Sequence, residues 1–347
     1  MSPYALSIIM SSLAAGTTLT LTSNHWFLAW MGLELNTLAI IPLMSKTHHP
    51  RATEAATKYF LIQALASALI LFSSTTNAWF TGEWEITNVS HPMSSTLLTV
   101  ALAMKLGIAP FHFWLPDVLQ GSNLFTCLIL STWQKIAPIT LLIQINMQLN
   151  TNLLIIMATM STIIGGWGGL NQTQLRKIMA YSSIAHLGWM MLVLSFMPTL
   201  TTLNLIIYMT MTTTMFIMLM NLLSTTMNKM AMSWLKNPTT AALMMITLMS
   251  LGGLPPMTGF MPKWLIIQEL TKQNMIAVMT IIALSSLLNL FFYLRMSYSM
   301  SLTTSPNLSN IYAIWRQKNK NMMFLSMMIV LSTLMLPITP TMINMMN

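Results

Sequence analysis

Charge is the scarcest feature of this 347-residue sequence, because only 6% of its residues are charged while 55% are hydrophobic. Soluble domains carry about a quarter charged residues, so a soluble globular protein is excluded. Cysteine is nearly absent as well. Cys127 is the single example, which excludes disulfides, iron–sulfur clusters and cysteine-ligated zinc within the chain. The sequence also lacks Walker A, dinucleotide-binding and paired-histidine haem patterns, so we expect no redox cofactor in this chain.

Long apolar runs fill the sequence, and a bilayer core of about 30 Å needs about 20 apolar residues per helix. This rule predicts an all-α polytopic membrane protein with eleven transmembrane helices. The predicted spans are 3–22, 25–45, 53–79, 93–115, 123–145, 150–171, 174–195, 199–224, 240–269, 275–298 and 322–344. The first run lacks a basic flank and a small-residue cleavage site, so we expect a retained helix and not a signal peptide.

The basic residues outside the apolar runs indicate an orientation. With the N-terminus inside, alternating spans leave one basic residue, Lys272, on the outer side. The inner set is Lys46, Arg51, Lys58, Arg176, Lys177, Lys229, Lys236, Arg295, Arg316, Lys318 and Lys320. This is a positive-inside bias, and single scattered charges indicate topology and not a nucleic-acid patch. The abundance of Met (38 residues) and Thr is typical of vertebrate mitochondrially encoded membrane proteins, so the inner side would be the matrix.

Two predicted spans are interrupted, the fourth within Lys105–Asp117 and the ninth within Leu251–Lys263. Pro110 removes a backbone donor and is expected to break the fourth helix. Each interrupted helix is the fourth of five, and five helices per repeat invert the second repeat relative to the first. Interruptions at matching positions therefore predict an inverted-repeat transporter, although no residue-level repeat is evident. The prediction is one membrane domain, 1–347, made of repeats 1–146 and 150–298 and an extra helix, 322–344.

Four charged residues lie within predicted spans and do not fit the topology pattern: Glu34, Lys105, Lys135 and Lys263. A charge in a membrane helix costs about 3 kcal/mol on insertion scales, and such residues usually serve a function. The alternatives are a structural ion pair for Glu34 and an amine that reaches the interface for Lys105 or Lys263. A buried lysine keeps its charge only with help from its neighbours, so it can pass a proton on when a neighbour changes. We therefore predict a proton relay.

His112 and His186 are the histidines within predicted spans. Imidazole donates and accepts protons near neutral pH, so both are further relay candidates. The alternative is that each is only a hydrogen-bond partner between helices. Asp117, at the end of the interrupted stretch, is expected to cap the following helix or to pair with a cation on the inner side.

The stretch Lys105–Asp117, K-L-G-I-A-P-F-H-F-W-L-P-D, resembles the signature of the antiporter-like membrane subunits of respiratory complex I. Gly165–Gly188 and Leu251–Lys263 resemble the same family, so the resemblance covers nearly the whole chain. Members of this family have fourteen helices, which implies that this chain lacks an equivalent of the first three.

The resemblance implies one proton-translocating unit in the inner mitochondrial membrane, driven by electron transfer from NADH to ubiquinone in partner subunits. Glu34 and Lys105 would form an ion pair, Lys135 would be the bridging lysine, and Lys263 the lysine of the second interrupted helix. Flavin, iron–sulfur clusters and quinone would belong to partner subunits. The implied partners are other membrane-arm and accessory subunits, lipids including cardiolipin, protons and water, but no nucleic acid.

Two other functions are compatible with the sequence. A stand-alone cation/proton antiporter would use the same lysines and would be active alone in liposomes. A non-transporting scaffold would hold pump modules together, but it gives no reason for four charged residues within the membrane.

Overall fold

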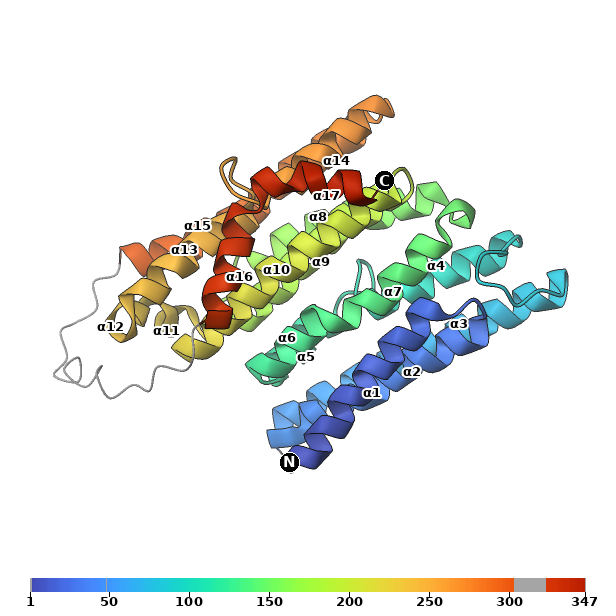
Figure 1. Cartoon of the computed structure of the whole chain (residues 1–347), viewed down its shortest axis with the longest axis horizontal. Helices are drawn as coiled ribbons and strands as arrows, with labels where there is room; N and C mark the ends of the chain where they lie inside the picture. Colours follow the sequence, from blue (N-terminus) through green and yellow to red (C-terminus); the bar gives the residue numbers. More distant parts are fainter. Residues whose placement is uncertain (1, 48, 303–322, 347) are drawn as a thin grey trace. The chain divides into compact units, whose positions relative to one another are not determined.

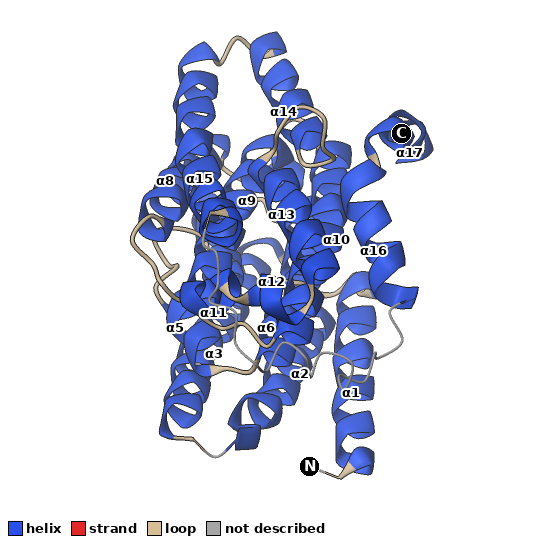
Figure 2. Cartoon of the chain, turned by 90° about the vertical axis from the view of Figure 1, so that its left-hand side faces the viewer, coloured by secondary structure: helices blue, strands red, loops and turns tan. Residues whose placement is uncertain are grey.

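The computed structural model describes residues 2–47, 49–302 and 323–346, and it contains helices but no strand within these ranges (Figures 1 and 2). The first half has α1 (Pro3–Thr22), α2 (Trp26–Met44), α3 (Pro50–Thr81), α4 (Pro92–Leu106), α5 (Trp114–Gly121), α6 (Leu124–Ser131), α7 (Trp133–Gln144) and α8 (Thr151–Gly169). The second half has α9 (Leu175–Leu194), α10 (Pro198–Leu222), α11 (Met227–Ala231), α12 (Ser233–Lys236), α13 (Pro238–Gly252), α14 (Phe260–Lys272), α15 (Ile276–Ser301), α16 (Met323–Leu334) and α17 (Thr339–Met346).

Eight helical segments in the described ranges are long and apolar enough to cross a bilayer. They are α1, α2, α3, the α6–α7 segment, α8, α9, α10 and α15. The pair α16 and α17 would make a ninth, but it is bent by 65°. Helix length therefore supports eight or nine spans, and eleven stays a prediction. Of the predicted inner basic set, Arg316, Lys318 and Lys320 lie outside the described residues.

The chain divides into two compact units. Unit 1 comprises Met1–Ser161 and Leu194–Pro198, and unit 2 comprises Thr162–Val193 and Thr199–Asn347. Glu34, Lys105, His112 and Lys135 belong to unit 1, whereas His186 and Lys263 belong to unit 2.

Small residues let the helices of unit 1 approach closely. A Cβ atom on Gly32 of α2 would lie 2.8 Å from the carbonyl oxygen of Gly16 of α1, so the two backbones are nearly in contact. Figure 1 shows α1, α2 and α3 running alongside one another, and α3 also packs against α4 and α5. The short helices α4 and α5 are thereby held against a long one.

Unit 2 uses glycine in the same way. A Cβ atom on Gly165 of α8 would lie 2.8 Å from the backbone nitrogen of Ala185 in α9, and one on Gly169 would lie 2.9 Å from the ring of Phe292 in α15. The glycine-rich part of the sequence therefore allows close helix packing, as in other membrane proteins.

Both predicted breaks are present, but each begins at a glycine and not at a proline. α4 ends before Gly107 (φ 75°) and α13 ends before Gly253 (φ 82°). Glycine adopts this left-handed conformation without steric cost. The expectation that Pro110 ends the fourth helix was therefore wrong, because α4 has already ended at Leu106, four residues earlier.

The same hydrogen bonds close both helix ends. The N–H that follows each glycine donates back to the last turn, from Ile108 to the Ala103 carbonyl (3.0 Å) and from Leu254 to the Met249 carbonyl (3.4 Å). Each glycine N–H also donates to a carbonyl of that turn. This is the Schellman arrangement, which satisfies carbonyls that a helix terminus leaves without partners.

Several positions of the two interrupted segments match at a constant separation of 146 positions. Both α4 and α13 have 15 residues and begin with proline. The matched pairs are Pro92 and Pro238, Gly107 and Gly253, Pro110 and Pro256, Trp114 and Phe260, and Pro116 and Pro262. These matches support the expectation of a repeat, which stays a prediction.

Candidate functional site

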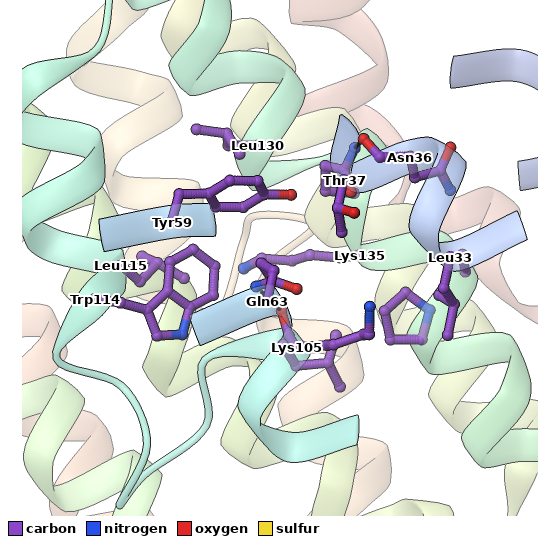
Figure 3. A pocket seen from close by; sticks show the side chains of 14 residues that line it. Leu33, Asn36, Thr37, Tyr59, Gln63, Lys105, Trp114, Leu115, Leu130 and Lys135 are labelled. Carbon is purple, nitrogen blue, oxygen red and sulfur yellow. Dashed lines mark hydrogen bonds between the residues drawn. The ribbon is translucent and has the colours of Figure 1, made fainter. Parts of the chain in front are cut away.

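Lys105 and Lys135 lie on the walls of one cavity in unit 1, although they come from different helices (Figure 3). Its volume is about 20 Å³, room for about one water molecule. The other lining residues are Leu33, Asn36, Thr37, Tyr59, Gln63, Leu106, Trp114, Leu115, Leu130, Gln134, Ala137 and Pro138. Figure 3 shows Tyr59 and Trp114 on one side and Asn36 and Thr37 on the other. Two lysine side chains thus share a small, partly polar cavity.

Lys135 lies beside a local interruption of the helix that carries it. The predicted span 123–145 is present as the α6–α7 segment, Leu124–Gln144, but its helix has a one-residue interruption at Thr132, where α6 ends and α7 begins. Lys135 is in the first turn of α7 and only 4% exposed. Pro138, three residues on, has no N–H to donate to the Gln134 carbonyl. The interruption therefore places backbone polar groups beside a buried amine.

Lys105 is in the last turn of α4 and only 6% exposed. Its Nζ atom has no hydrogen-bond partner among the described residues. Its position in the last turn means that the negative end of the α4 helix dipole favours its charge. Gln63 of α3 fixes this end of α4 by donating to the Lys105 carbonyl (3.4 Å). The amine is held in place with its charge only partly compensated.

Glu34 and His112 lie near this cavity without forming its walls, as the described residues define them. Glu34 is half-buried, and its Oε2 atom has no hydrogen-bond partner in the described structure. It makes no direct ion pair with Lys105 in the part of the chain described here. His112 is buried in the turn between α4 and α5, where its ring packs on Phe113 at 4.2 Å between centroids.

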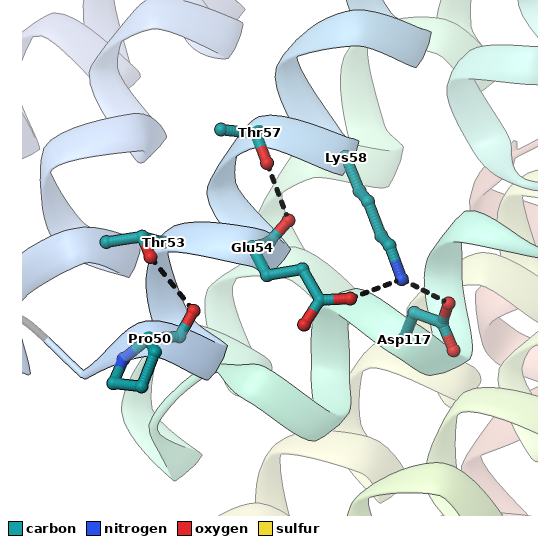
Figure 4. A network of polar contacts seen from close by, with 6 residues as sticks. All are labelled: Pro50, Thr53, Glu54, Thr57, Lys58 and Asp117. Atoms are coloured by element: carbon teal, nitrogen blue, oxygen red, sulfur yellow. Dashed lines mark hydrogen bonds and ion pairs between the residues drawn. The ribbon is translucent and has the colours of Figure 1, made fainter.

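Asp117 pairs with a cation of the predicted inner set. Its Oδ2 atom lies 3.0 Å from Lys58 Nζ, which also contacts Glu54 at 2.8 Å (Figure 4). The expectation of a cation partner is confirmed. The pair ties α5, the helix after the break, to α3.

Lys263 occupies the corresponding break of unit 2. Its Nζ atom donates to the carbonyl of Gly252, the last residue of α13 (2.8 Å). A cation there satisfies a free carbonyl and complements the negative end of the helix dipole. Lys105 and Lys263 thus both lie at the C-terminal end of a short helix. Lys105 belongs to that helix, α4, whereas Lys263 belongs to α14 and reaches back to the end of α13.

His186 lies in a hydroxyl-rich part of unit 2. Its ring centroid is 5.5 Å from that of Tyr208, and Tyr208 pairs with Ser183. Tyr293 of α15 is buried near Ser182, and its hydroxyl has no hydrogen-bond partner within the described ranges. Part of this cluster was recognisable in the sequence. Ser182 and Ser183 precede His186 by four and three residues, so they share its face of the helix. The two tyrosines could not be assigned from the sequence.

No group of three or more His, Cys, Asp or Glu side chains that would suit a metal occurs in the described ranges. The structure places buried lysines at helix interruptions, with hydroxyl and amide groups around them. Interrupted membrane helices with charged residues at their ends are typical of ion-translocating membrane proteins.

Comparison with known proteins narrows this class. Residues 23–289 match the family model described as NADH:quinone oxidoreductase/Mrp antiporter, TM, and residues 290–343 match NADH dehydrogenase subunit 2 C-terminus. The chain therefore belongs to the NADH:quinone oxidoreductase/Mrp antiporter membrane family. It is 58% identical over 342 residues to the NADH-ubiquinone oxidoreductase chain 2 of Squalus acanthias, covering 98% of each chain. It is 58% identical over 341 residues to that of Xenopus laevis, covering 98% of this chain and 99% of the relative.

Solved structures share the fold. A chain of respiratory complex I from Thermus thermophilus with bound aureothin matches with a TM-score of 0.81 at 25% identity, covering 97% of this chain and 80% of that one. A chain of the Mrp complex from Dietzia sp. DQ12-45-1b matches with a TM-score of 0.77 at 18% identity, covering 86% of this chain and 61% of that one. The second likeness concerns the fold alone.

Proposed function

We propose that the chain is the subunit 2 type of membrane-arm subunit of a mitochondrial NADH:ubiquinone oxidoreductase. In this role it translocates protons across the inner membrane while partner subunits transfer electrons from NADH to ubiquinone. The observation that carries the proposal is the cavity shared by Lys105 and Lys135, in a chain whose relatives of nearly equal length are NADH-ubiquinone oxidoreductase chains. Those relatives favour it over the alternative of a stand-alone cation/proton antiporter.

The proposed mechanism is a charge relay. A rearrangement near Glu34 changes the electrostatic support of Lys105, and Lys135 in the same cavity then takes up or releases a proton. His186 and Lys263 carry the relay in unit 2, where Lys263 caps the end of α13. His112 adjoins the first break as a further proton carrier. A proton passes along these groups without any change of redox state in the chain itself.

The proposed architecture is eleven spans in two inverted sets of five, 1–146 and 150–298, with 322–344 as an additional helix. The separation of 146 positions between the two interrupted segments supports two related sets. Their identical helix lengths and matching glycine caps support it further. The N-terminus would face the matrix and the C-terminus the intermembrane space.

The proposed partners follow from this assignment. They are other membrane-arm and accessory subunits of the complex, and lipids including cardiolipin. Flavin, iron–sulfur clusters and quinone would be held by partner subunits. Proton transfer within this chain would then use only its own side chains and the water bound between them.

The test is Lys135→Met in the assembled complex, with protons pumped per NADH oxidised as the measurement. Methionine keeps the length of the side chain but cannot carry a proton, so we expect the ratio to fall by the share of one translocating unit. Lys229→Met, at an exposed position of α11, is the matched control and should leave the ratio unchanged. If Lys135→Met assembles normally and pumps the wild-type number of protons per NADH, the proposal is wrong.

A further inference from the structure

A second cavity lies between α3 and α5, at the end of unit 1 where α3 begins and α5 ends. Its volume is about 170 Å³, and most of its lining is polar. The lining residues are Arg51, Glu54, Ala55, Lys58, Asp117, Gln120 and Gly121. Figure 4 shows three of them, with Lys58 held between Glu54 and Asp117. A cavity of this size and polarity holds several water molecules.

The same two helices line the lysine cavity. α3 contributes Tyr59 and Gln63, and α5 contributes Trp114 and Leu115. On α3, the two cavities together use positions 51, 54, 55, 58, 59 and 63, whose spacing keeps them on one face of the helix. The polar cavity and the part of the lysine cavity that α3 and α5 line therefore follow one another along the contact between these two helices, which we call the α3–α5 seam.

An aromatic pair lies where the lining of the lysine cavity comes next to that of the polar cavity, because Tyr59 follows Lys58 on α3 and Trp114 lies three residues before Asp117 on α5. The rings of Tyr59 and Trp114 meet edge to face at 5.7 Å between centroids, and both side chains are buried. Trp114 Nε1 donates to the Met104 carbonyl (3.1 Å), so its indole is anchored beside Lys105 at the end of α4. The hydroxyl of Tyr59 is on the lysine side of the pair (Figure 3). Of the two rings, only Tyr59 can both accept and donate a proton.

We propose that the α3–α5 seam is the route by which protons from the aqueous phase reach Lys135, with Tyr59 and Trp114 as its gate. This inference rests on the proposed function and identifies where the proton comes from. A hydrated proton from the aqueous phase gives its extra proton to the Tyr59 oxygen and is left as water. The hydroxyl proton already on Tyr59 passes to the neutral amine of Lys135, which becomes an ammonium group, so the phenol is unchanged after each transfer. Because Trp114 is anchored beside Lys105, movement of Lys105 opens or closes the gate.

The test compares Tyr59→Phe with Lys135→Met in the assembled complex. Phenylalanine keeps the ring contact with Trp114 but removes the hydroxyl, so we expect the protons pumped per NADH to fall as far as in Lys135→Met. Tyr298→Phe, 55% exposed near the end of α15, is the matched control and should match wild type. A wild-type ratio in Tyr59→Phe beside a lowered ratio in Lys135→Met would overturn the seam and leave the proposed function standing. A wild-type ratio in Lys135→Met would overturn both.

A second measurement needs no variant and covers the case in which Tyr59→Phe fails to assemble. Radiolytic hydroxyl labelling oxidises aromatic side chains that have water beside them. We expect Trp114 and Tyr59 of the wild-type complex to be oxidised several-fold faster during NADH turnover than Trp189, which is also buried but lines neither cavity. Equal rates for Trp114 and Trp189 would overturn the seam.

Discussion

Gly259→Ala is expected to prevent stable accumulation of the chain in its complex. A Cβ atom at Gly259 would overlap the carbonyl oxygen of Ser250, which belongs to the last turn of α13. Gly259 has a helix-like backbone (φ −66°, ψ −15°), so the cost is steric and not conformational. The overlapped atom is backbone and cannot rotate away, so the loop between α13 and α14 must move. We expect a loss of about 3 kcal/mol or more, measured as the abundance and thermal midpoint of the assembled complex.

Gly252→Ala is the matched control, seven residues away in the same segment. The nearest atoms to its added Cβ are 3.8 Å away on Tyr293, an ordinary van der Waals contact. Gly252 is the last residue of α13, where alanine is a better helix former by up to about 1 kcal/mol. We therefore expect normal or slightly raised stability. An equal loss of stability in Gly259→Ala and Gly252→Ala would contradict this prediction, because the contact with Ser250 would then not be the cause.

The intramembrane charges and the two breaks were predictable from the sequence, because each violates a strong rule. Hydrocarbon disfavours an unpaired charge, which singles out Glu34, Lys105 and Lys135 in apolar runs. Glycine and proline clusters disfavour a continuous helix, which singles out both interrupted segments. The exact helix end was less predictable. For the fourth span the proline rule predicts a break at Pro110, whereas a left-handed glycine, Gly107, ends the helix first.

The walls of the lysine cavity were not predictable, because they come from helices distant in the sequence. Tyr59 is an ordinary residue of a long apolar helix, and only the packing of α3 on α4 and α5 brings it to the lysines. The Lys263 contact with Gly252 is a different case. Its two ends are close in the sequence, but the contact depends on how the chain turns between α13 and α14. The surroundings of the lysines therefore depend on side chains that lie outside the sequence motifs.

Lys105→Met is expected to make the complex more stable and to lower the protons pumped per NADH. Methionine matches the length of the lysine side chain and removes a buried amine that has no hydrogen-bond partner in the described structure. Leaving such a polar group buried costs about 1–3 kcal/mol, so its removal should raise the thermal midpoint. Lys272→Met is the control, because Lys272 is exposed in an ion pair with Glu269 at 2.5 Å and should change neither quantity noticeably.

The sign of the stability change decides between a functional and a structural Lys105. If Lys105 were the counter-ion that keeps Glu34 in the membrane, its loss would strand a buried carboxylate and destabilise the complex by about 3–5 kcal/mol. Glu34 is only half-buried and makes no direct ion pair with Lys105 in the described residues, so the cost of stranding it should be smaller than the gain from removing the amine. A lower thermal midpoint in Lys105→Met would favour the structural role. A higher midpoint with reduced pumping would mean that an unfavourable buried cation is kept because proton transfer requires it.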